Sequence, residues 1–126
     1  MFQKNKMVKK ARKAIESMYD GICTITEYQE YIKPNKSTGY HEVIVLEEQP
    51  CRLSFSSSPN TNPQENNAAE IAQTIKVFLS PDIKVNAGSK LTITQNGVTT
   101  EYKNSGVPAV HETHQEITLE LFKGWA

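Results

Sequence analysis

The chain has 126 residues, which suits a single domain, spanning 1–126, with one hydrophobic core. Hydrophobic residues make up 37% of the chain and are interspersed with Thr, Ser, Asn and Gln, so we expect a small core with polar outer faces. The formal net charge is zero, which argues against a dedicated nucleic-acid-binding protein. Because the sequence lacks a membrane-spanning apolar run and the apolar core of a signal peptide, we expect the protein to stay in the cytoplasm.

Basic residues are concentrated at the N-terminus. Six of them precede the first acidic residue, Glu16, so the rest of the chain carries 14 acidic and 8 basic residues. These six are Lys4, Lys6, Lys9, Lys10, Arg12 and Lys13. Two interpretations remain open: a solvated helix face, or an electrostatic contact with an acidic neighbour, either protein or DNA.

Residues 4–19 have the periodicity of an amphipathic helix. Apolar residues recur at steps of three and four, at Met7, Ala11, Ala14, Ile15 and Met18, and lysines occupy the other faces. Asp20 and Gly21 follow, and Gly21 suits the left-handed conformation that ends many helices. We therefore predict one N-terminal helix.

The rest of the chain has strand periodicity. Alternation of period two begins at Ile22, and Asn96-Gly97 is a strong two-residue hairpin turn. The predicted strands cover 22–28, 40–47, 51–55, 74–80, 90–95, 98–102 and 116–122. Six or seven short strands separated by turns favour a mainly β fold, a small six- or seven-stranded β-barrel, because closure removes the unpaired edges of a sheet.

One connection is much longer than the others. Residues 56–73 are rich in Ser, Asn, Pro and Gln, and their second half, from Glu65, has helical propensity. Compact domains usually connect neighbouring elements with a handful of residues, so a connection of this length is either disordered or functional.

The sequence contains no clear catalytic or cofactor motif. A phosphate-binding Gly-rich loop and a nucleophile elbow are both missing, so we expect no enzyme and no cofactor. His111 and His114 are three residues apart, a spacing that places two metal ligands side by side on a helix. Here they follow Gly106 and Pro108 and are expected to lie in a loop, where the same spacing does not bring them together. We therefore predict no metal site. Cys23 and Cys51 fall in strands and are expected to be free buried thiols, or a disulfide if those strands pair.

A small barrel that binds single-stranded nucleic acid is an alternative. Such proteins stack bases on exposed aromatic side chains in a positive groove. The chain has suitable aromatic residues, among them Tyr28, Tyr31 and Tyr40, but Glu27, Glu30 and other acids surround them. Most of these aromatic residues are better explained by packing.

Four stretches carry a resemblance to a known family: Gln49–Pro59, which leads into the long connection, Thr74–Leu79, Gly88–Gly97 and the ending Leu119–Ala126. They resemble the head-to-tail connector (stopper) proteins of tailed bacteriophages, in the version carried by PBSX-like prophages of Bacillus. The resemblance implies a structural virion protein, not an enzyme. It would form a homo-oligomeric ring between the portal-side adaptor and the tail and close the channel through which double-stranded DNA passes. It would be made in the bacterial cytoplasm and end in the neck of the particle. A tail-side completion protein is an alternative.

The resemblance also assigns roles to residues. It implies a channel-gating loop within 56–73, with Ser56, Ser57, Ser58, Pro59, Asn60, Glu65, Asn66 and Asn67 as candidate gating residues. Candidate partner contacts are the six basic residues of the N-terminus together with Phe122 and Trp125. For Trp125, the only tryptophan of the chain, two interpretations stay open: it fills the open end of its own barrel, or it contacts a neighbouring subunit or the tail.

Overall fold

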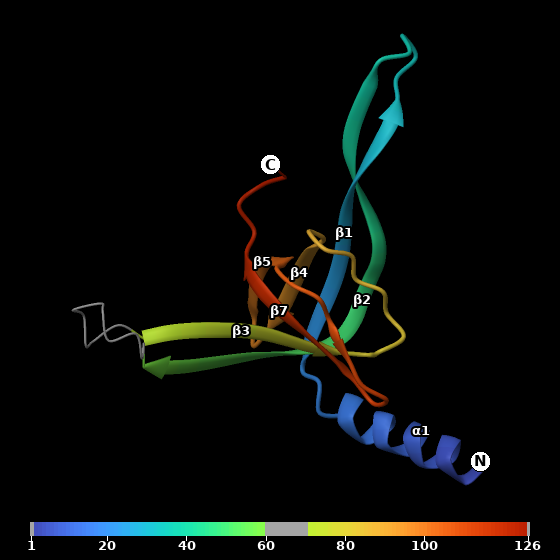
Figure 1. Ribbon diagram of the computed structural model, residues 1–126, viewed down its shortest axis with the longest axis vertical. Helices are drawn as coiled ribbons and strands as arrows, with labels where there is room; N and C mark the ends of the chain where they lie inside the picture. Colours follow the sequence, from blue (N-terminus) through green and yellow to red (C-terminus); the bar gives the residue numbers. More distant parts are fainter. Residues whose placement is uncertain (1, 60–70, 126) are drawn as a thin grey trace.

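The computed structural model describes residues 2–59 and 71–125 and shows one helix followed by an antiparallel sheet (Figure 1). The helix α1 spans Phe2–Glu16. The strands are β1 (Gly21–Ile32), β2 (Thr38–Pro59), β3 (Ile71–Leu79), β4 (Lys90–Gln95), β5 (Val98–Asn104), β6 (Ala109–Val110) and β7 (Gln115–Leu121).

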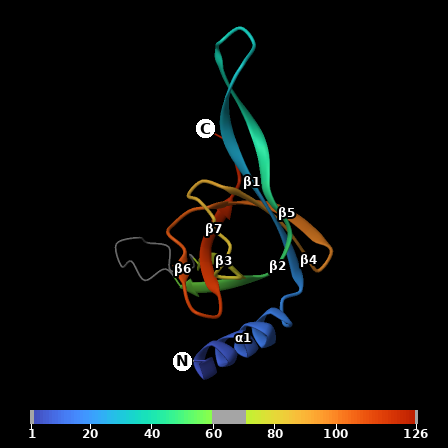
Figure 2. The same cartoon turned by 90° about the vertical axis from the view of Figure 1, so that its right-hand side faces the viewer.

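The sheet closes on itself. Its strand order is β3-β2-β1-β4-β5-β7-β6, and an additional pairing between β3 and β7 joins the two sides into a ring of strands, visible in Figure 2. The short β6 pairs only with the start of β7. The predicted small β-barrel-like fold is confirmed, and so is the turn at Asn96-Gly97, where both residues have positive φ and Gln95 pairs with Val98.

The core lies inside this ring. Along each strand, every second side chain points inward. Val77 and Leu79 of β3 therefore meet Ile117 of β7, and each of these three side chains is 0% exposed. The buried apolar residues are Cys23, Ile25, Cys51, Leu53, Val77, Leu79, Val85, Leu91, Ile93, Tyr102, Ile117 and Leu119. Phe55 and Leu121 continue the same patterns but are each 53% exposed, because their strands run past the end of the core.

Two strand pairs extend beyond the ring as hairpin arms (Figure 1). The β1–β2 arm comprises residues 27–43, which pair from Glu27↔Val43 to Ile32↔Thr38. The predicted strands 40–47 and 51–55 form one continuous β2. Glu48 takes a positive φ of 50° near the bulge in the β1–β2 register, and Pro50 lies just before pairing with β3 begins, where its missing N–H is tolerated.

The β2–β3 arm corrects the prediction of a loop over residues 56–73. Ser56–Pro59 belong to β2 and residues 71–73 to β3, with register Ser57↔Gln73 and Pro59↔Ile71. Backbone hydrogen bonds extend this ladder without requiring apolar side chains, so polar composition did not end the strand. Asn60, Glu65, Asn66 and Asn67, and the expected helical turn up to residue 70, lie outside the described residues.

The helix differs from its prediction at the C-terminal end. It stops at Glu16, and Gly21 begins β1 rather than ending the helix. Met7 and Met18 of the apolar stripe are 70% and 64% exposed, so the stripe is not buried against the barrel. A polar contact joins α1 to the barrel instead: Arg12 Nη1 lies 2.9 Å from Asp82 Oδ2, and Arg12 Nε donates to the carbonyl oxygen of Glu112 at 2.7 Å.

Candidate functional site

A buried cation lies where the β1–β2 arm meets the barrel. Lys90, the first residue of β4, is 8% exposed, and its Nζ lies 2.9 Å from Glu42 Oε1 and 3.1 Å from Glu101 Oε2. The same Nζ lies 5.1 Å from the ring centroid of Phe122 and 5.9 Å from that of Trp125, within the range of cation–π attraction. We call these five residues the Lys90 cluster. It joins β2, β4, β5 and the C-terminal segment.

Two pKa shifts follow from these contacts. Burial acts to lower the pKa of Lys90, but hydrogen bonds to Glu42 and Glu101 outweigh it and the pKa is raised above 10.5. Hydrogen bonds from Trp125 and Lys90 lower the pKa of Glu42 below 4.5. The charged form of Lys90 therefore stabilises the fold until the pH rises through its raised pKa. The charged form of Glu42 stabilises the fold until the pH falls through its lowered pKa. Both are present at neutral pH.

Trp125 extends a ladder of aromatic rings along the arm. Tyr28 stacks on Tyr40 at 5.4 Å between centroids and on Trp125 at 5.1 Å, with only 7° between the Trp125 and Tyr28 planes. Trp125 Nε1 donates to Glu42 Oε1 at 2.9 Å, and the Phe122 ring meets Trp125 edge-on. Trp125 thus folds back on its own chain but is half-buried and lies outside the core, so the interpretation that it fills the barrel is wrong.

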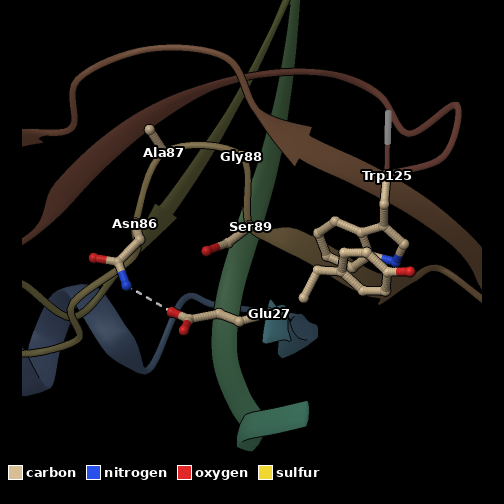
Figure 3. A pocket seen from close by; sticks show the side chains of 7 residues that line it. Glu27, Asn86, Ala87, Gly88, Ser89 and Trp125 are labelled. Atoms are coloured by element: carbon tan, nitrogen blue, oxygen red, sulfur yellow. Dashed lines mark hydrogen bonds between the residues drawn. The ribbon is translucent and has the colours of Figure 1, made fainter. Parts of the chain in front are cut away.

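A pocket of about 330 Å³ adjoins this ladder (Figure 3). Glu27, Tyr28, Trp125 and the segment 86–89 line it, and Asn86 Nδ2 donates to Glu27 Oε2 at 2.7 Å. The Ser89 hydroxyl is buried and has no hydrogen-bond partner among the described residues. Because Glu27 brings negative charge to its wall, the pocket does not suit a phosphate group.

Two buried amide side chains position the connection that carries this pocket. Gln115 Nε2 donates to the carbonyl oxygens of Ser80 at 2.6 Å and Ile83 at 2.5 Å. Asn104 Nδ2 donates to the Asn86 carbonyl oxygen at 3.1 Å. Gln115 is 1% and Asn104 2% exposed, and their bonds satisfy backbone carbonyl groups of a connection whose last residues, Gly88 and Ser89, also form backbone hydrogen bonds with Asn104 of β5.

The predicted partner contacts fall in two separate places. Lys6, Lys9, Lys10 and Lys13 are exposed on α1, Arg12 contacts its own barrel, and the Lys4 side chain lies outside the described part of the chain. Phe122 and Trp125 lie with the C-terminal segment beside the β1–β2 arm, on the other side of the barrel from α1 (Figure 1). The structure therefore does not join the six basic residues and the aromatic pair into one surface.

The two cysteines are free and buried, as predicted. Their neighbouring strands bring them together, and a side-chain hydrogen bond with Cys51, together with burial, raises the pKa of Cys23 far above its usual range. Since the thiolate is the reactive form of cysteine, this environment makes the Cys23 thiol inert.

The structure brings together two histidines that were predicted to lie in a loop and Glu116, which was predicted to begin the last strand. One ligand atom from each of His111, His114 and Glu116 lies within 4.8 Å of the others. The two histidine rings stack at 4.7 Å between centroids. The available sequence signal was their spacing across a two-residue hairpin turn, where residues three apart face each other.

Replacing Trp125 with alanine is expected to lower the free energy of unfolding by about 1–2 kcal/mol, because it removes a half-buried ring, its stacking on Tyr28 and one hydrogen bond. Urea unfolding measures this. The matched control is Tyr31→Ala on the opposite face of the arm, which should leave the C-terminal segment in place. A loss as large as that of a core residue, or no loss, would contradict the half-buried position.

No family model matches the chain, and no curated protein matches it. Among solved structures, the chain is similar to the phage-like element PBSX protein xkdH from Bacillus subtilis. The sequence identity is 10% and the TM-score 0.47, covering 79% of this chain and 91% of that one. A likeness at this level carries no argument about function. In the described ranges, no helix has the length and apolar character needed to span a membrane.

Proposed function

We propose that this protein is a structural component of a phage-type particle, a ring-forming connector that joins head and tail and closes the DNA channel. The sequence resemblance supports this role, and so does a fold consisting of a small closed barrel with two projecting arms and a basic helix. Each projection is a place at which neighbouring subunits can be contacted.

The observation that carries the proposal is a group of exposed apolar side chains on one face of the β1–β2 arm. Tyr28, Tyr40 and Ile32 share this face by register and are 44%, 56% and 77% exposed, and Ile44, 55% exposed, continues it at the base of the arm. Glu30 and Glu42 lie on the same face. A two-stranded hairpin is only marginally stable in water by itself. The exposure of these side chains is explained if a neighbouring subunit covers them in the assembled particle.

The β2–β3 arm is the proposed gate. Ser56 and Ser57, two of the candidate gating residues, lie on the part of this arm that extends past the core. The chain outside the N-terminal 13 residues is acidic, which suits a DNA conduit because a negative lumen does not retain the passing phosphates.

The basic face of α1 is proposed to contact an acidic surface of the adjoining ring. Lys6→Gln together with Lys10→Gln is expected to reduce incorporation of the labelled protein into purified particles and to weaken the salt dependence of that incorporation. Monomer stability should change by no more than about 0.5 kcal/mol, because both side chains are exposed. Sedimentation of particles followed by quantification of the label measures incorporation.

The control is Lys84→Gln with Lys123→Gln, which removes the same charge from exposed sites outside α1. If both pairs of substitutions reduce incorporation equally, net charge rather than the helix is responsible. Co-sedimentation with isolated tails but not with heads would favour the tail-side completion role.

Binding of single-stranded nucleic acid is the second candidate function, favoured by the exposed Tyr28–Tyr40 stack beside Lys90. Glu42 and Glu101 neutralise Lys90, and Glu27 lies nearby in the pocket wall, which opposes this candidate. Salt-sensitive binding of single-stranded DNA by the isolated protein, without incorporation into particles, would support it over the connector.

A further inference from the structure

We propose that the turn between β6 and β7 is a binding site for a zinc-type transition metal ion, with His111, His114 and Glu116 as its ligands. The proposal is independent of the connector role and rests on the geometry of the hairpin.

Hairpin register places all three side chains on one face. Val110 pairs with Gln115, and the His111 N–H donates to the His114 carbonyl oxygen at 2.8 Å, so the two histidines are the next facing pair across a two-residue turn. Glu116 follows His114 at the spacing of two that keeps strand residues on one side. Gln115 and Ile117 point into the core, which leaves the three candidate ligands on the outer face.

The local hydrogen bonds prepare His114 for coordination. Its Nδ1 lies 3.1 Å from Thr113 Oγ1, and its Nε2 lies 3.4 Å from Glu116 Oε1. In one tautomer of His114, Nε2–H donates to Glu116 Oε1. In the other tautomer, which carries the proton on Nδ1, that N–H is directed at Thr113 Oγ1 and the lone pair of Nε2 faces a carboxylate oxygen. A cation between them removes this repulsion, and a second-shell partner on the other ring nitrogen is the usual arrangement for a metal-binding histidine.

The set of donors selects the class of metal. Two imidazole nitrogens and one carboxylate oxygen suit Zn²⁺ and neighbouring divalent ions better than Mg²⁺ or Ca²⁺, which prefer oxygen ligands. All three donor atoms already lie within 4.8 Å of one another, so small side-chain rotations bring them to coordination distance. Solvent has access to this face, since His111 is exposed, and water completes the coordination.

Two neighbouring groups bear on the site. Lys76 Nζ of β3 lies 4.0 Å from Glu116 Oε2, and this cation competes weakly with a metal for the carboxylate. The carbonyl oxygen of Glu112, between the two histidines, accepts the hydrogen bond from Arg12 of α1. A bound ion therefore orders the turn on which the N-terminal helix is held.

The test uses the untagged full chain, stripped of metal with a chelator and titrated with ZnCl₂ by calorimetry. We expect one ion per chain with a micromolar dissociation constant, and a melting temperature raised by roughly 5–10 °C at saturating Zn²⁺. Titration with Co²⁺ should give visible d–d absorption, which reports coordination by protein ligands.

The chain contains three histidines, which provides a matched set of variants. His111→Ala should weaken Zn²⁺ binding at least about tenfold, and His114→Ala should do the same. His41→Ala, on the β1–β2 arm, should leave binding unchanged. Because His111 is exposed, its substitution tests the site even if His114→Ala disturbs the fold. Millimolar binding to the parent chain, or micromolar binding that survives His111→Ala, would overturn the proposal.

Discussion

Gln115→Ala is expected to destabilise the protein by about 2–4 kcal/mol, because it takes this donor from the Ile83 carbonyl oxygen and leaves the Ser80 carbonyl oxygen with the 3.3 Å hydrogen bond from the Ile83 N–H. Gln115 is 1% exposed, so water does not replace the lost hydrogen bonds without local opening. Urea unfolding measures the loss. Amide hydrogen exchange in residues 80–85 should also become faster, because the Gln115 side chain holds this part of the connection at Ser80 and Ile83.

Gln29→Ala is the matched control for this substitution. Gln29 is exposed on the β1–β2 arm, and its side-chain Nε2 makes a long hydrogen bond, 3.5 Å to Glu27 Oε1. Its substitution should change stability by no more than about 0.5 kcal/mol. If the two variants are equally stable, the buried amide does not hold the connection in place.

Lys90→Met is the second substitution with a large expected effect, a loss of about 1–2 kcal/mol together with release of the C-terminal segment. Methionine preserves much of the buried aliphatic volume but removes two ion pairs and the cation near Phe122 and Trp125. The expected loss is smaller than for a fully buried ion pair, because Glu42 and Glu101 are half-exposed and stay hydrated when Lys90 is removed. Urea unfolding and Trp125 fluorescence measure the two effects.

Lys103→Met separates this cluster from an ordinary surface ion pair. Lys103 Nζ lies 3.2 Å from Glu120 Oε1, but the Lys103 side chain is 42% exposed. Its substitution should cost at most about 0.5–1 kcal/mol and leave Trp125 fluorescence unchanged. A Trp125 signal that is also unchanged in Lys90→Met would show that stacking on Tyr28 alone holds the segment.

The candidate site was only partly predictable from the sequence. The sequence shows basic residues on the predicted helix and two aromatic residues near the C-terminus. It does not show which residues of the same chain they contact. Arg12 contacts Asp82 across 70 positions, and Trp125 contacts Glu42 across 83. Such contacts depend on which strands become neighbours, and no local pattern encodes that.

The sequence by itself determined the local elements: the N-terminal helix, the period-two strands, the Asn96-Gly97 turn and most of the inward-facing residues, from Cys51 and Leu53 to Ile117 and Leu119. These follow from side-chain periodicity and backbone preferences, which act over a few residues. The tertiary structure alone decided how far β2 and β3 extend, where Trp125 lies and that His111, His114 and Glu116 meet. Strand length depends on backbone hydrogen bonds to a partner strand, and register across strands sets which side chains face each other, so both are fixed only when distant segments pair.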